Sequence, residues 1–71
     1  MPSINRYIEI HDEHRIRINT CEGHVGITDE RRALSGTAKD RNWRGVAQID
    51  MTRDQAVELI ARLSDQLLKH Y

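Results

Sequence analysis

The C-terminal segment 53–71 constrains the fold more than any other part of the sequence, because it contains neither glycine nor proline. Thr52, followed three residues later by Gln55, forms a capping-box pattern, in which the two residues hydrogen-bond each other's backbone N–H groups at a helix start. Asp54 lies in the first turn, where a negative charge matches the helix dipole. These signals predict one long α-helix over residues 52–70.

The apolar residues of this helix form two adjacent rows. At 100° per residue, the first row contains Ala56, Leu59, Ile60, Leu63 and Leu67. The second row lies roughly 100° around the helix, so that the apolar arc spans about 200°, whereas one sheet needs little more than about 100°. We therefore expect a homodimer whose helices pair through Val57, Ala61, Ser64 and Leu68. The alternative is that the connection 31–42 folds over the second row.

The first two thirds of the chain has the pattern of β-strands. Residues 7–10 and 15–18 alternate apolar with polar side chains, as half-buried strands do, and residues 11–14 between them read as a hairpin turn. Two further strands are expected at residues 24–27 and 45–50. We predict a single α+β domain over residues 1–71, with an antiparallel three- to four-stranded β-meander, its strands within residues 4–50, packed against one long C-terminal α-helix.

The length of the chain limits its core. A domain of 71 residues buries only about 60% of the surface that its unfolded form exposes. Cys21 is the single cysteine, so no disulfide can form within one chain, and this favours a reducing cytoplasm. No apolar run approaches the roughly 18 residues of a membrane span. We expect a soluble, cytoplasmic protein that does not bind membranes.

Three histidines and the cysteine suggest a zinc site by their spacing. His11 and His14 form one pair of candidate ligands, and Cys21 and His24 form the other. If residues 15–20 are a strand, however, the two pairs lie roughly 23 Å apart. Four ligands from one chain cannot then meet, so no metal and no cofactor is expected. One variant survives, in which a histidine of the first pair meets the second pair of a neighbouring chain across a two-fold axis.

No pattern for catalysis stands out. Cys21 and His24 are too close in sequence, beside a glycine turn, to form a thiol and base with a third orienting group. The four glycines are too scattered for a phosphate-binding loop. We therefore expect no catalytic residues and no enzymatic activity.

The segment 31–44 is the clearest candidate for a working surface. The chain has no net charge, but its first thirty residues are rich in acids, whereas this segment is basic. The candidate partner-binding residues are Arg31, Arg32, Arg41, Trp43 and Arg44. Trp and Arg dominate binding hot spots, which predicts a non-enzymatic interaction protein: a small regulator or inhibitor that binds a protein partner. One alternative is a nucleic-acid-binding module that uses residues 31–44, and a second is a metal-binding protein.

Overall fold

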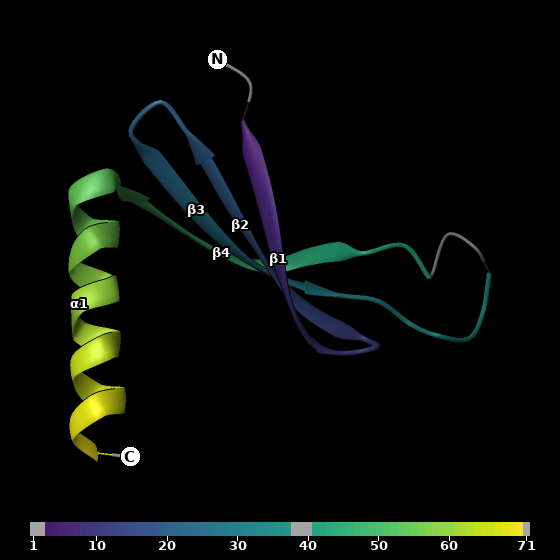
Figure 1. The fold of residues 1–71 in the computed structure, drawn as a ribbon. Helices are drawn as coiled ribbons and strands as arrows, with labels where there is room; N and C mark the ends of the chain where they lie inside the picture. Colours follow the sequence, from purple (N-terminus) through teal and green to yellow (C-terminus); the bar gives the residue numbers. More distant parts are fainter. Residues whose placement is uncertain (1–2, 38–40, 71) are drawn as a thin grey trace.

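The computed structural model describes residues 3–37 and 41–70, which form a four-stranded sheet followed by one helix (Figure 1). The elements are β1 (Ile4–His11), β2 (His14–Cys21), β3 (His24–Arg31), β4 (Arg44–Thr52) and α1 (Arg53–His70). Each strand pairs antiparallel with its neighbour in sequence, in the order β1-β2-β3-β4. The predicted α+β class, with a β-meander and a C-terminal helix, is confirmed, and the meander has four strands.

The first two turns show how the meander is formed. Glu22 and Gly23 connect β2 to β3 with φ angles of 41° and 81°, as in the two-residue turns that match the twist of paired strands. Asp12 and Glu13 connect β1 to β2, although this pair is not one that tight hairpins favour. There the register shifts between Glu9 and His11, so a β-bulge accommodates the turn.

The helix begins at Arg53, one residue after the predicted start at Thr52. The Thr52 N–H donates to Gln55 Oε1 at 3.0 Å, and the Gln55 N–H donates to Thr52 Oγ1 at 3.2 Å, so the capping box is confirmed. The Arg53 N–H donates to the Gly23 carbonyl at 2.9 Å, which ties the first turn of α1 to the β2–β3 turn. Because β4 ends at Thr52 and α1 begins at Arg53, no linker separates them.

One face of the sheet is apolar and open. Residues directly opposite each other on neighbouring strands point to the same face, and isoleucines pair across all four strands. The pairs are Ile8 with Ile16, Ile18 with Ile27, and Ile27 with Ile49. Ile8 is 51% exposed and Ile49 is 62% exposed. Ile16, Ile18 and Ile27, on the two inner strands, are half-buried.

The helix packs against the sheet only near its N-terminal end. It contacts β3 and β4 there, and Ala56 and Leu59 are half-buried. Farther along the first row, Ile60, Leu63 and Leu67 are exposed. In Figure 1, α1 runs away beside the sheet rather than across its face. Within the described residues no hydrophobic residue is buried, and the two buried residues are the polar Thr28 and Glu30.

Sheet and helix together make a flat molecule. The Cα atoms extend 42 × 37 × 16 Å, with a radius of gyration of 14.7 Å. In the described residues, no helix has both the length and the hydropathy that crossing a bilayer would require.

Candidate interaction surface

The predicted partner-binding residues gather at the end of the sheet that lies away from α1 (Figure 1). Arg31 ends β3 and Arg44 begins β4, and the two are register partners. In the β3–β4 connection, Arg32 directly follows Arg31, and Trp43 directly precedes Arg44. Arg41 lies two residues before Trp43 in the sequence. Residues 38–40 of the predicted segment lie outside the described residues.

Trp43 is the centre of a cluster that includes two residues from β1 and β2. The Arg15 Cζ atom lies 4.2 Å from the Tyr7 ring centroid and 4.3 Å from the Trp43 ring centroid. The Arg32 Cζ atom lies 4.5 Å from the Trp43 ring centroid. Guanidinium groups at these distances are attracted by the electron-rich face of an aromatic ring. We call Tyr7, Arg15, Arg32 and Trp43 the aromatic–arginine cluster.

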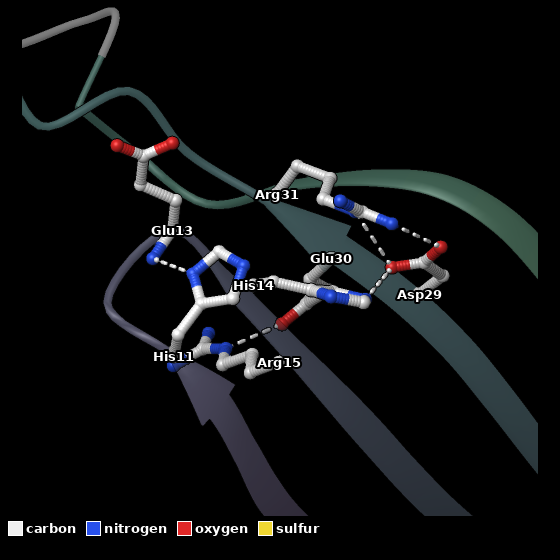
Figure 2. Close-up of polar contacts among 7 residues, drawn as sticks. All are labelled: His11, Glu13, His14, Arg15, Asp29, Glu30 and Arg31. Atoms are coloured by element: carbon white, nitrogen blue, oxygen red, sulfur yellow. Dashed lines mark hydrogen bonds and ion pairs between the residues drawn. The ribbon is translucent and has the colours of Figure 1, made fainter.

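Glu30 fixes the position of Arg15 within the aromatic–arginine cluster. The Arg15 Nε atom donates to Glu30 Oε1 at 2.7 Å (Figure 2), and Arg17 Nε lies 3.6 Å from Glu30 Oε2. Glu30 is only 7% exposed, and a carboxylate so buried requires partner charges to offset the loss of its hydration. Arg15 and Glu30 are also direct register partners on β2 and β3. The guanidinium of Arg15 is thus fixed by the sheet, by a carboxylate and by two rings.

The β1–β2 turn is joined to the cluster through Arg32. The Arg32 N–H donates to the Glu13 carbonyl at 3.0 Å, and Arg32 Nε donates to the Asp12 carbonyl at 2.8 Å. Two acidic residues therefore lie in the turn that contacts the basic segment. Their charges reduce the positive potential around Arg32, so this end of the sheet is not a purely basic patch.

A second polar group lies at the same end of the sheet. His14 Nε2 lies 2.7 Å from Asp29 Oδ1, and Arg31 Nε donates to the same oxygen at 3.2 Å (Figure 2). The hydrogen bond from Arg31 is the main cause that lowers the pKa of Asp29 below its ordinary value of 3.8. Asp29 is opposite Ile16 and Ala47, so this group borders the apolar face.

The candidate zinc ligands remain in two separate pairs. The rings of His11 and His14 meet edge to face, with centroids 5.7 Å apart, beside the β1–β2 turn. Cys21 and His24 are register partners at the opposite end of β2, a fully formed strand. In residues 3–37 and 41–70, no three His, Cys, Asp or Glu side chains lie close enough to hold a metal ion.

Sequence reasoning found Trp43 and Arg32 but missed Tyr7, Arg15 and Glu30. The signal was present in the alternation of the strands, because Tyr7 and Arg15 each directly precede an isoleucine and so point to the face opposite the isoleucines. Arg41 and Arg44 were predicted with Trp43, but both are exposed and the structure does not place them in the aromatic–arginine cluster.

The residues predicted for the dimer interface lie along an exposed row of α1. Leu68 is 85% exposed and Val57 is 57% exposed, and Ala61 and Ser64 between them are exposed as well. The β3–β4 connection was the alternative cover for this row. Its described parts lie at the opposite end of the sheet from α1 (Figure 1).

Comparison of the chain with protein-family models, with curated proteins and with solved structures found no match.

Proposed function

We propose that this chain is a non-enzymatic interaction protein, a small regulator or inhibitor that binds a protein partner through the aromatic–arginine cluster. The observation that carries the proposal is the position of Arg15 between Tyr7 and Trp43, held by the buried Glu30. Trp, Tyr and Arg are the residues that contribute most to protein–protein hot spots. Because these side chains are already ordered, binding loses little of their conformational entropy.

A protein partner fits this surface better than a nucleic acid does. Phosphate backbones bind grooves of uniform positive charge, with aromatic rings on which bases stack. Here the carboxylate of Glu30 contacts Arg15, and Asp12 and Glu13 lie in the turn that Arg32 contacts. A protein surface with its own mixture of charged and apolar groups is complementary to this arrangement. Binding of nucleic acid through residues 31–44 remains the alternative.

The proposal includes a homodimer as the working unit and the cytoplasm as its location. The exposed row of Val57, Ala61, Ser64 and Leu68 supports the homodimer, because contiguous exposed apolar residues usually mark an interface. The single cysteine supports a reducing compartment.

Affinity capture with the tagged protein tests the proposal. Wild type and Trp43→Ala are compared by quantitative mass spectrometry in a lysate of the source organism, and each enriched protein is then purified and titrated. We expect Trp43→Ala to weaken binding at least about tenfold, since a hot-spot truncation costs about 2 kcal/mol or more. Arg62→Ala is the matched control, because Arg62 is exposed on the polar side of α1, where it forms an exposed ion pair with Glu58 at 3.5 Å.

Two further variants locate the surface more finely. Arg41→Ala together with Arg44→Ala removes the exposed arginines outside the aromatic–arginine cluster, and the melting temperature should change little, because such surface substitutions cost within about 0.5 kcal/mol. Loss of binding in this double variant, with Trp43→Ala unaffected, would move the site to the exposed arginines.

A salt titration separates the two candidate functions. Binding to random single-stranded DNA and RNA is measured at increasing salt concentration, where phosphate contacts weaken steeply. We expect no binding beyond a weak component that disappears at physiological salt. Tight binding that depends on Trp43 would favour the nucleic-acid alternative.

A further inference from the structure

A single chain exposes more surface than a compact protein of its size. Accessible surface scales with mass, and a monomeric protein of 8.3 kDa exposes about 4,600 Å². This chain exposes 6009 Å², an excess of about 1,400 Å² over that expectation. Its radius of gyration of 14.7 Å likewise exceeds the about 11 Å expected for a domain of this length.

Two exposed apolar surfaces contribute to this excess. One is the isoleucine face of the sheet, whose strands of 8 residues span about 26 Å. The other is the first row of α1 beyond Leu59, where Ile60, Leu63 and Leu67 are exposed on a helix of 18 residues, about 27 Å long. An apolar helix stripe of this kind normally packs on an apolar sheet face, so each surface is suited to cover the other.

Beyond the N-terminal part of α1, which contacts β3 and β4, the junction between strand and helix keeps the two surfaces of one chain apart. No residue separates β4 from α1, and the capping box sets the direction in which the helix leaves the strand. The hydrogen bond from Arg53 to Gly23 fixes the first turn further. A helix that crossed its own sheet would need a reversal of the chain at this point, and there are no residues to make it.

We propose that two copies of this chain exchange helices. The exposed part of the first row of each α1, Ile60, Leu63 and Leu67, covers the isoleucine face of the other copy's sheet, and the second rows meet at the two-fold axis. The residues at the axis are Val57, Ala61, Ser64 and Leu68. This arrangement rests on the homodimer proposed above, and it accounts for the full apolar arc of the helix, because both rows are then buried.

The area supports a second copy as the occupant. If each chain buries its excess, the pair buries about 2,800 Å², within the range of about 2,000–5,000 Å² found for obligate homodimers. Contacts of each helix with the other sheet are reciprocal, as a closed two-fold dimer requires. The polar side of α1 carries both charges, in pairs that form within the helix, with Glu58 to Arg62 at 3.5 Å and Asp65 to Lys69 at 3.0 Å. That side is therefore suited to water rather than to an anionic membrane surface.

Helix exchange leaves the aromatic–arginine cluster accessible. Tyr7, Arg15 and Glu30 alternate with the isoleucines along their strands, so they lie on the opposite face of the sheet. A dimer built in this way presents two copies of the cluster on its outer surfaces. It would bind two partner molecules, or one partner that has two equivalent sites.

The first experiment uses the wild-type protein. Light scattering at micromolar concentration should give the mass of two chains, and the melting temperature should rise with protein concentration, because unfolding and dissociation are one transition. A folded single chain, a larger assembly, or a melting temperature independent of concentration would each overturn the proposal.

The second experiment distinguishes exchanged helices from simple pairing of folded chains. Two differently tagged wild-type dimers are mixed, and mixed dimers are counted over time by native mass spectrometry. We expect them to appear at the rate of global unfolding, measured separately by hydrogen exchange, because helices that cover another sheet can separate only when the fold opens. Mixed dimers that form much faster than unfolding would contradict helix exchange and leave ordinary helix pairing.

Variants of the second row sharpen the result. Leu68→Glu should lower the dimer fraction and the helical circular dichroism together, whereas Arg62→Gln, which makes the same change in net charge on the polar side, should change neither. A stable, fully helical single chain from Leu68→Glu would contradict exchange. Neither readout involves the protein partner, and Trp43→Ala should remain a dimer, so a failure here is separate from a failure of the proposed function.

Discussion

The two faces of the sheet differ in what a single chain provides for them. On the polar face, Glu30 and Thr28 are buried, and Arg15 is held by a carboxylate and two rings. On the apolar face, Ile8 and Ile49 are more than half exposed, and the helix that could cover them leads away. Glu30 and Arg15 on the polar face are thus paired within the chain, although Arg17 Nε is buried without a hydrogen-bond partner among the described residues. On the apolar face, the isoleucines of the edge strands remain exposed.

This difference reverses the usual order of burial in a globular domain. Large apolar side chains are normally the most buried, and glutamate is almost never fully buried unless it is paired. Here the paired glutamate is buried, whereas Ile8 and Ile49 are open and the isoleucines of the inner strands are only half-buried. In the dimer proposed above, the hydrophobic core would be completed by assembly, while the aromatic–arginine cluster is formed by each chain alone.

A charge on the first row of α1 should have the largest effect on the stability of the protein. Leu63→Glu places a carboxylate on the first row of α1, and if a second sheet covers that row, the substitution should cost at least about 3 kcal/mol of stability. Thermal melting by circular dichroism measures the loss. In an isolated chain the same residue is 53% exposed and the change would cost little, so an unaltered melting temperature would contradict a covered face.

Removing the buried carboxylate should have the next largest effect. Glu30→Ala leaves Arg15 and Arg17 without their shared counter-charge, and we expect a loss of about 2–3 kcal/mol, below that of a fully buried pair because the arginines are partly exposed. Chemical denaturation measures it. Glu9→Ala, at an exposed position opposite Arg15, is the control and should stay within about 0.5 kcal/mol.

Loss of the helix cap should have a smaller effect. Thr52→Ala removes the acceptor for the Gln55 N–H and should destabilise the protein by about 1 kcal/mol, measured by thermal melting. Thr52→Ser keeps a hydroxyl at the same position and should retain most of the stability. Equal losses in both variants would mean that the hydroxyl does not act as a cap.

The smallest effect should come from acidification. Arg31 lowers the pKa of Asp29 below 3.8, so the unfolded chain takes up a proton at this group before the folded chain does. The stability from Asp29 is therefore complete above about pH 5 and is lost as the pH falls through the lowered pKa. The difference in melting temperature between wild type and Asp29→Asn should shrink over that window. A difference that persists to the lowest pH would assign the effect to something other than this carboxylate.

The sequence predicted the features that depend on neighbours in the chain. The capping box of Thr52 and Gln55 and the alternation along the strands are local patterns, and both are present in the structure. The aromatic–arginine cluster depends instead on strand register, which places Arg15 opposite Glu30. That register follows from the two-residue turn at Glu22 and Gly23, and the pairing of β1 with β2 depends on a bulge near Glu9. A hydrophobic pattern does not specify the position of either feature.

The lengths of β3 and β4 also could not be predicted from local sequence patterns. Strands were expected at residues 24–27 and 45–50, but β3 continues to Arg31 and β4 begins at Arg44. The added residues have no apolar alternation, and their pairing is accompanied by contacts of Asp29 with His14 and Arg31 and of Glu30 with Arg15. An ion pair between two strands cannot be recognised from the sequence of either strand alone, because its two partners lie in different parts of the chain.

The connectivity of the meander has a consequence for the time course of synthesis. Every strand pairs with its neighbour in sequence, and hairpins of this kind form within about 1–10 μs. The assembly proposed above then waits for a bimolecular encounter, which slows as the protein becomes scarce. The sheet would be ready almost at once, but its isoleucine face would stay open until a second chain arrives. The yield of working protein would therefore depend on how many chains are made together, and synthesis of neighbouring copies from one messenger RNA would favour it.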